Sequence, residues 1–179
     1  MNFKSRRIFK TTTSSQQEIR ELLQLIFVSE VVSPGERVWL VTPWISNVPI
    51  LDNRSGLFSS LDPNWGQRLI RLNEILMRLA EFGTEVVIVT RPDDHCRTYV
   101  QILREELESM GLGARLVVLW REELHTKGVL TERALLTGSM NLTNNGLDLL
   151  DEQVTLDTDA TDIAQGRINF ESYLAENLW

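Results

Sequence analysis

Short runs of Val, Ile and Leu alternate along this chain with longer segments that have the periodicity of amphipathic helices. Residues 85–90 (E-V-V-I-V-T) and 115–120 (R-L-V-V-L-W) have the length and composition of buried strands, and a helical segment separates them. Strands and helices in alternation predict a layered α/β fold with helices on both faces of a sheet. Residues 125–130 and 134–141 are two further strands joined only by T-E-R, which makes a hairpin and therefore a mixed sheet. We expect one α/β domain per chain, with a mixed β-sheet flanked by helices on both faces.

The remaining elements follow from hydrophobic periodicity and from turn residues. Apolar positions at helical spacing predict helices at about residues 16–32, 65–82, 94–110 and 161–178. Strands are expected at residues 37–45 and 152–157. Residues 47–64 carry Pro, Asn, Gly and Ser and predict a long loop, and loops of this length are often functional.

Length and composition limit the class of protein. The 179 residues suit a single domain over residues 1–179, and 42% hydrophobic and 24% charged residues are typical of globular proteins. Cys96 is the only cysteine, so no internal disulfide can form and a reducing compartment is expected. No segment has the apolar run of a secretory signal or of a membrane span. We expect a cytoplasmic protein without a membrane partner.

The charge of the chain is acidic overall but uneven. A formal net charge of −7 argues against broad, non-specific binding to DNA or RNA. Residues 1–15, however, form a basic, polar N-terminal arm without acids, and residues 148–162 form an acidic stretch without bases. Net charge therefore does not decide the substrate, because a local basic groove can still hold a phosphate backbone.

Residues 125–141 (H-T-K-G-V-L-T-E-R-A-L-L-T-G-S-M-N) place four polar side chains of complementary chemistry in one hairpin. His125 can attack phosphorus and form a covalent phosphoramidate, which splits one difficult displacement into two easier ones. Lys127 leaves the same face of the strand and can hold the same phosphate. Ser139 and Asn141 repeat this spacing on the partner strand and can donate hydrogen bonds to the non-bridging oxygens. Each residue alone has an ordinary structural interpretation, but together they predict a site that cleaves a phosphodiester.

This segment resembles the HKD motif of the phospholipase D superfamily, H-x-K-x4-D-x6-G-S-x-N, and the resemblance covers about residues 37–178. The residues that match the motif are His125, Lys127, Gly138, Ser139 and Asn141. Glu132 stands in place of the aspartate of the motif, and five residues rather than six separate it from Gly138. The resemblance also implies that an acid shortly after the motif, here Glu152, orients the histidine.

Four further residues are candidates for substrate binding. Gly138 permits close approach of the backbone to a bound group. Thr42 and Trp44 end the strand at residues 37–45, and Trp44 either packs in the core or lines the site, where it could stack on a base. Glu132 lies in the turn of the hairpin, where it either contacts substrate or is simply solvated.

A metal site at His95 and Cys96 is not expected. The chain has no second cysteine and no H-x-x-x-H or C-x-x-C pair, so the spacing of metal ligands is missing. We interpret His95 as an exposed residue at the start of a helix and expect neither a metal nor a cofactor.

One motif supplies half of what the reaction requires. Cleavage of a phosphodiester needs a nucleophile on one side and an acid for the leaving oxygen on the other. Members of the superfamily supply both from two HKD motifs, and this chain leaves no room for a second half. The resemblance therefore implies a homodimer in which His125 of each copy faces the other across a two-fold axis.

The leading hypothesis is a metal-independent nuclease acting on DNA or RNA, because small single-motif members of the superfamily are most often nucleases. The resemblance extends to phospholipase D-like proteins of DNA-modification gene clusters, which implies a setting in DNA modification or phage defence, with other proteins of such a system as partners. Two alternatives stay open. A phosphodiesterase for lipids or small molecules fits the acidic charge, and a catalytically silent module that keeps the phosphate pocket fits Glu132 and the shortened spacing.

Overall fold

A central mixed sheet takes up most of the Val-, Ile- and Leu-rich runs of the chain. The computed structural model describes residues 5–11 and 16–175. The sheet has seven strands in the order β1-β9-β8-β7-β2-β5-β6. Its strands are β1 (Ser5–Lys10), β2 (Arg37–Val41), β5 (Glu85–Thr90), β6 (Leu116–Trp120), β7 (Gly128–Leu130), β8 (Leu135–Gly138) and β9 (Glu152–Asp157). Strands β2, β5 and β6 run parallel to one another, and β7, β8, β9 and β1 continue the sheet in antiparallel pairs.

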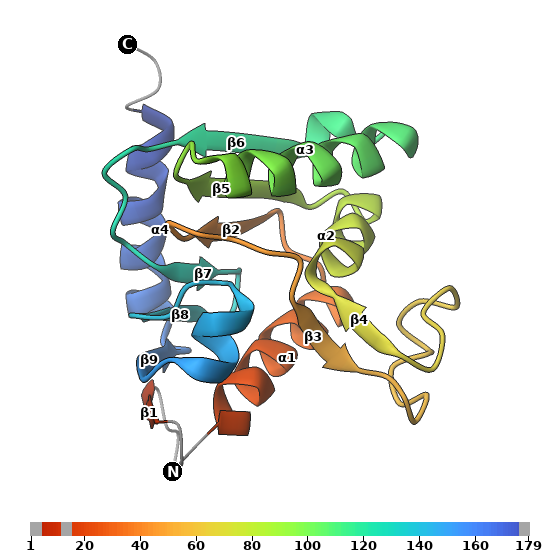
Figure 1. Ribbon diagram of the computed structural model, residues 1–179, viewed down its shortest axis with the longest axis horizontal. Coiled ribbons are helices and arrows are strands. Elements are labelled where there is room, and N and C mark those ends of the chain that lie inside the picture. The colour runs from red at the N-terminus through yellow and green to blue at the C-terminus, as the bar shows by residue number, and fades with distance from the viewer. Residues whose placement is uncertain (1–4, 12–15, 176–179) are drawn as a thin grey trace.

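Helices cover both faces of this sheet (Figure 1). The helices are α1 (Gln16–Val32), α2 (Leu72–Glu81), α3 (Asp94–Ser109) and α4 (Ala160–Ala175). Buried side chains of α1, α2 and α3 share one hydrophobic cluster, and those of α4 belong to a second cluster. The predicted fold class, a single α/β domain with a mixed sheet between helices, is confirmed.

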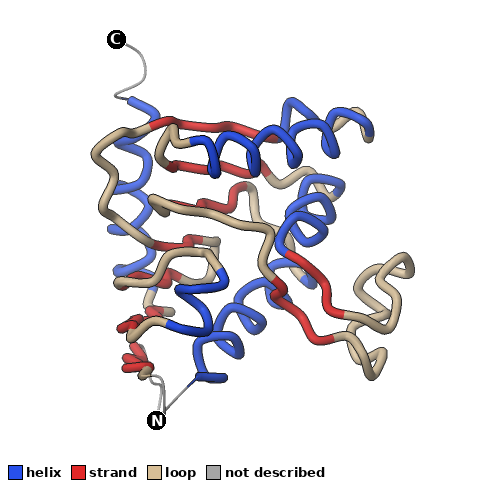
Figure 2. The backbone as a smooth tube through the Cα atoms, in the orientation of Figure 1, coloured by secondary structure: helices blue, strands red, loops and turns tan. Residues whose placement is uncertain are grey.

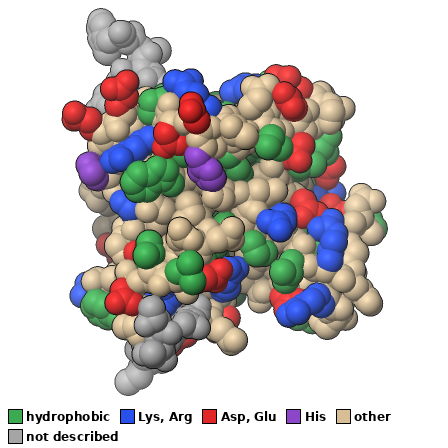
Figure 3. All heavy atoms as spheres, in the orientation of Figure 1, with side chains coloured by type: hydrophobic (Ala, Val, Ile, Leu, Met, Phe, Trp, Pro, Cys, Tyr) green, Lys and Arg blue, Asp and Glu red, His purple; other side chains and the backbone are tan. Residues whose placement is uncertain are grey.

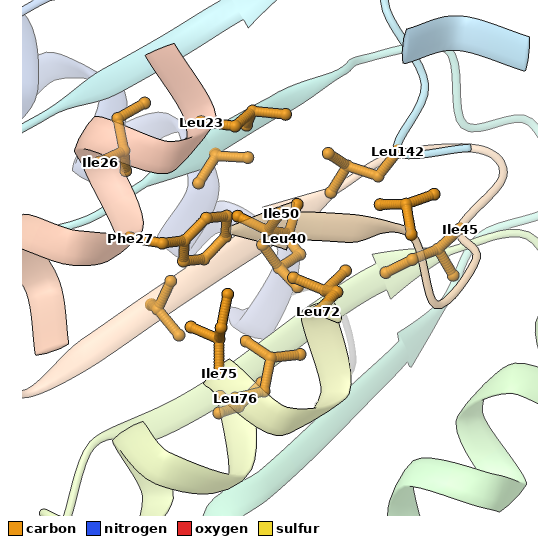
Figure 4. Close-up of a cluster of buried hydrophobic side chains, with 14 of the residues drawn as sticks. Leu23, Ile26, Phe27, Leu40, Ile45, Ile50, Leu72, Ile75, Leu76 and Leu142 are labelled. Atoms are coloured by element: carbon orange, nitrogen blue, oxygen red, sulfur yellow. The ribbon is translucent and has the colours of Figure 1, made fainter. Parts of the chain in front are cut away.

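The alternation of side chains along β5 divides the core in two. Val86 and Ile88 belong to the cluster under α1, α2 and α3, whereas Val87 and Val89 pack with Phe170 of α4. Figure 4 shows the larger cluster, in which side chains of α1, α2 and β2 meet. Each fully buried aliphatic side chain contributes about 1.5–3 kcal/mol, so a strand buried on both faces holds the two helical layers together.

The structure corrects the predicted helix at residues 65–82. Leu69–Arg71 forms strand β4, and α2 begins only at Leu72. The carboxylate of Glu74 accepts a hydrogen bond from the Arg71 N–H at 3.0 Å, which satisfies one of the free N–H groups at the start of α2. The predicted apolar positions from Leu72 onward are those that α2 buries, but the predicted helix begins seven residues, about two turns, too early.

The predicted loop at residues 47–64 also contains regular structure. Strand β3 (Pro49–Asp52) pairs with β4 in a separate two-stranded sheet. This hairpin and its long connection project from the body of the protein (Figures 1 and 2). The connection is tied down by Asn53, whose buried side chain donates to the carbonyls of Trp65 and Gly66, both at 3.1 Å.

The N-terminal segment contains a strand rather than an arm alone. Residues Ser5–Lys10 form β1, which pairs antiparallel with β9 at one edge of the sheet. Residues 1–4 and 12–15 of the predicted arm lie outside the described residues. None of the helices in the described part of the chain is long and apolar enough to cross a membrane.

Candidate active site

The two halves of the motif meet where the parallel strands of the sheet have their carboxyl ends, which is called the carboxyl edge of the sheet below. In the β7–β8 hairpin Gly128 lies opposite Thr137, so the residues that precede β7 and those that follow β8 are neighbours. Gly128 also lies opposite Val41, which places the end of the parallel strand β2 at the same edge. The carboxyl ends of parallel strands are the usual position for sites in α/β sheets. The structure thus brings the motif together with the segments that follow β2 and β5.

His125 is exposed just before β7 and contacts two cationic side chains. Its Nε2 lies 3.5 Å from Nη2 of Arg91, and its carbonyl accepts a hydrogen bond from Nζ of Lys127 at 2.7 Å. The expected strand begins only at Gly128. His125 and Lys127 are therefore neighbours through the backbone of a loop, not through the alternation of a strand.

Ser139 and Glu152 form a pair on the other side of the motif. The Ser139 hydroxyl donates to the carboxylate of Glu152, and it accepts from the Gln153 N–H at 3.0 Å. Glu152 is 7% exposed, so its hydrogen bond from the Ser139 hydroxyl is largely shielded from water. We expected Glu152 to orient His125, but no hydrogen bond joins them in the described part of the chain. The Glu152 carboxylate instead accepts from Ser139, which lies beside it at the β8–β9 pairing, and a role for Glu152 in orienting His125 stays a prediction.

A buried lysine lies behind this pair. Lys10 is opposite Glu152 in the β1–β9 pairing and is 2% exposed. Its ammonium donates to the carbonyls of Gly146 and Leu147, both at 3.0 Å, in the π-helical turn η2 (Asn145–Leu149). Burial lowers the pKa of Lys10, and the nearby charge of Glu152 opposes that shift. Strand β1 thus supports the loop that follows the motif.

The amide of Asn141 is held by the end of β2. The hydroxyl of Thr42 lies 3.2 Å from Oδ1 of Asn141 and 2.9 Å from the carbonyl of Trp44. A hydroxyl has one proton, so it donates to one of these oxygens at a time. Because Oδ1 faces Thr42, the NH2 end of the Asn141 amide is the end available to a substrate oxygen.

Gly138 allows two strands to approach closely at the turn into the motif. A Cβ at this position would lie 2.0 Å from the Gln153 carbonyl oxygen and 2.8 Å from the Cα of Val154. Both atoms belong to the backbone of β9 and cannot move aside. Gly138 is thus required for strand packing beside Ser139, whether or not it also approaches a substrate.

Glu132 lies away from this edge. It sits in the turn between β7 and β8, at the opposite end of the hairpin from His125. Its carboxylate accepts two hydrogen bonds from the Arg167 guanidinium, at 3.1 and 2.7 Å, and this pairing lowers the pKa of Glu132. The structure does not bring Glu132 to the other motif residues, so the expectation that it binds substrate is corrected to an ion pair with α4.

Arg91 is the residue of this site that sequence reasoning missed. It directly follows β5, and its Nε donates to the carbonyl of Leu124 at 3.0 Å, next to His125. The available signal was its position after the run E-V-V-I-V-T, since a residue there lies at the carboxyl edge of the sheet. Arg91 also contacts the ring of Trp44, which is 42% exposed and is not part of the core.

The pair His95 and Cys96 has separate, ordinary surroundings. Nε2 of His95 lies 2.9 Å from Oγ of Ser46, and Cys96 is buried with its sulfur 3.3 Å from Oγ1 of Thr90. The described residues hold no group of three or more His, Cys, Asp or Glu side chains placed to bind a metal ion.

No family model matches the sequence, and no curated protein matches it. Among solved structures, NucT from Helicobacter pylori aligns with a TM-score of 0.59 and 11% identity, over 96% of this chain and 96% of NucT. Nuc from Salmonella typhimurium, a phospholipase D family member, gives a TM-score of 0.57 and 11% identity, over 96% of this chain and 91% of Nuc. The chain has a phospholipase D-like fold.

Phosphatidylserine synthase from Haemophilus influenzae has the same fold within a longer chain. It gives a TM-score of 0.57 and 20% identity over 94% of this chain, which corresponds to 37% of the synthase. Identities this low establish the fold alone, so the chemistry must be inferred from the residues at the sheet edge.

Proposed function

We propose that this chain is a metal-independent phosphodiesterase that cleaves DNA or RNA through a covalent bond between His125 and phosphorus. The observation that carries the proposal is the convergence of both halves of the motif at one sheet edge. Lys127 lies next to His125 and supplies positive charge for the oxygens of the attacked phosphate, and Arg91 adds a second cation on the other side of His125. The amide of Asn141 adds a neutral donor, and such donors stabilise the charge that develops in the transition state.

The proposed reaction has two displacements at phosphorus. A ring nitrogen of His125 forms a bond to phosphorus while the bond from phosphorus to the leaving oxygen breaks, and a second histidine gives that oxygen its proton. The second histidine, now neutral, then takes a proton from water as the water oxygen attacks phosphorus. The nitrogen–phosphorus bond breaks and His125 is regenerated.

We infer that the second histidine is His125 of a second copy of the chain. The chain contains only two histidines, and His95 is followed by Cys96 and Arg97, without the lysine and the G-S-x-N segment of the motif. A two-fold axis beside the exposed His125 would place two identical histidines on either side of one phosphate. The homodimer, the place of the protein in a DNA-modification or phage-defence system and its cytoplasmic location are parts of this proposal.

Labelled single- and double-stranded DNA and RNA, incubated with the protein in EDTA, test the proposal. We expect the wild-type protein to cleave and His125→Asn to be inactive with an unchanged unfolding midpoint. Glu132→Gln is the matched control, because Glu132 lies at the far end of the same hairpin. Activity that is lost in EDTA and restored by magnesium or zinc would contradict the mechanism.

A phosphodiesterase for lipids or small molecules is the second candidate. The net charge of −7 favours a small substrate over a long polyanion, and phosphatidylserine synthase shares the fold. The same assay, extended to phospholipid vesicles and to a chromogenic phosphodiester, separates the two. Cleavage of these substrates without cleavage of nucleic acid would replace the nuclease by this alternative.

A further inference from the structure

One exposed tryptophan lies beside the proposed nucleophile. Trp44 is 42% exposed, whereas Trp39 and Trp65 are 2% and 4% exposed. Arg91 contacts both Trp44 and His125: its Cζ lies 5.0 Å from the centre of the Trp44 ring, and its Nη2 lies 3.5 Å from Nε2 of His125. An aromatic ring of this size is normally buried, so its exposure next to a reactive group indicates a binding surface.

Arg91 is fixed by the backbone and has no acidic partner among the residues that the structure describes. Its Nε donates to the carbonyl of Leu124 at 3.0 Å, and its backbone N–H donates to the carbonyl of Pro43 at 3.4 Å. Within residues 5–11 and 16–175 its guanidinium contacts a carbonyl, an imidazole and an indole but no carboxylate. A cation that is positioned but not neutralised can bind a phosphate without first breaking an ion pair.

The segment after Trp44 continues along the motif. Ser46 donates its N–H to the carbonyl of Leu142 at 2.8 Å, and its hydroxyl lies 2.9 Å from Nε2 of His95. Leu142 directly follows Asn141, so this segment runs beside the second half of the motif. In Figure 3 the purple histidine side chains lie on one face, with Lys or Arg, Asp or Glu and hydrophobic side chains between them. The surface beside His125 therefore combines an aromatic ring, a cation and hydrogen-bonding groups.

We propose that Trp44 and Arg91 form a subsite for the unpaired nucleotide next to the cleaved phosphodiester, which makes single-stranded nucleic acid the preferred substrate. This inference rests on the proposed function. Arg91 binds a phosphate next to the one that His125 attacks, and the base stacks on the open part of the Trp44 ring. A base inside a duplex has both faces covered by its neighbours and can stack on the indole only after it is flipped out. Every base has a stacking face, so the subsite selects strandedness rather than sequence.

Binding to an inactive protein tests the subsite. In the His125→Asn background the oligonucleotide is not consumed, so affinity can be measured in EDTA by fluorescence anisotropy. The probes are a labelled single strand, a hairpin duplex of the same composition, and single strands with one abasic residue at successive positions. We expect Trp44→Ala to weaken single-strand binding about tenfold or more, to leave duplex binding within about twofold, and Trp44→Phe to restore most of the loss.

The abasic series and a matched control make the test specific. One abasic position should weaken binding when Trp44 is present and have no effect in Trp44→Ala, because the stacking partner is then already absent. Phe82→Ala is the control. Phe82 is 48% exposed and has Arg78 4.3 Å from its ring centre, so it is also an exposed aromatic ring with a cation beside it. It precedes β5, at the end of this strand that lies away from Arg91. This change should leave every affinity unaltered.

Three results for Trp44→Ala would overturn the subsite. The first is an equal loss of affinity for single strand and duplex, and the second is no loss of affinity for either. The third is a monomeric variant where the protein with Trp44 is a dimer. The last result would assign the indole to contact with a second copy. Failure of the proposed function is distinguishable from these. If the single strand binds in a Trp44-dependent way but wild-type protein cleaves no nucleic acid, the subsite stands and the nuclease assignment falls.

Discussion

The carboxylate of Glu152 and the ammonium of Lys10 are buried opposite charges at paired positions of β9 and β1. Lys10 donates to two carbonyls of the turn after the motif, and Glu152 accepts from Ser139. Removal of either charge takes away an opposite charge from the other in a region screened from water, although Asp148 and Asp151 still act on Lys10. The two residues should therefore contribute to stability as a unit, and through it to the position of Ser139.

A double-mutant cycle tests this coupling. We expect Lys10→Met to lower the free energy of unfolding by about 1–3 kcal/mol, because two carbonyls lose their donor. Glu152→Gln should lower it by a similar amount, and the double variant should lose less than the sum by about 0.5–3 kcal/mol. Urea unfolding of the four proteins measures this quantity. Additive losses would show that the two charges are independent.

The ion pair of Glu132 and Arg167 predicts a specific pH dependence. The pKa of Glu132 is lowered in the folded protein by hydrogen bonds from Arg167, so the ionised carboxyl stabilises the fold. This contribution is complete above the ordinary glutamate pKa of about 4.3 and is lost as the pH falls through the lower folded value. We expect Glu132→Gln to cost about 0.5–1 kcal/mol near neutral pH and nothing at the acid end of the curve. A difference that grows towards low pH would contradict this assignment.

At the scale of the elements, strands β8 and β9 approach each other closely at Gly138. We expect Gly138→Ala to lower the free energy of unfolding by about 3 kcal/mol and to abolish activity, because a Cβ would lie 2.0 Å from the Gln153 carbonyl oxygen. Gly66→Ala is the control, since a Cβ there has no atom within 4 Å. It should change stability by less than about 0.5 kcal/mol. Thermal unfolding of both variants makes the comparison, and equal midpoints would show that β9 can move away.

The elements that sequence analysis identified correctly are those with long, regular patterns. Helices α1 and α3 and the buried strands of the sheet center repeat their apolar positions often enough to define a period. Strands β3 and β4 have only four and three residues, too few to distinguish alternation from a loop. Strand β1 was missed because Arg and Lys suggested a solvated arm, although Ile8 and Lys10 face inward.

The same distinction applies to the candidate site. His125, Lys127, Ser139 and Asn141 lie within one hairpin, so their proximity could be predicted from local pairing. Arg91 reaches the site from β5, and no local pattern specifies that contact. Lys10 and Glu152 are likewise joined only by the pairing of the first and last strands. Contacts between distant segments depend on the order of strands in the sheet, and hydrophobic periodicity along the sequence does not specify that order.

At the scale of the whole molecule, the proposed site requires two copies of the chain. We expect light scattering to show a dimer at micromolar concentration. Wild-type subunits mixed and re-equilibrated with about a tenfold excess of His125→Ala subunits should lose about nine-tenths of their activity, because most wild-type chains then lie in heterodimers with one histidine. Activity proportional to the amount of wild-type chain would mean that each subunit has a complete site. An active monomer would have the same meaning.

The pairing of β1 with β9 also determines when the molecule becomes complete during synthesis. Ser5 lies opposite Asp157, so β1 leaves the ribosome before its partner strand and can pair only after the chain has been made as far as β9. Lys10 can support the turn after the motif only at that late stage. A nascent chain therefore has His125 and Lys127 before it has the support for Ser139, and the proposed site would stay unfinished until β9 has been made and paired with β1.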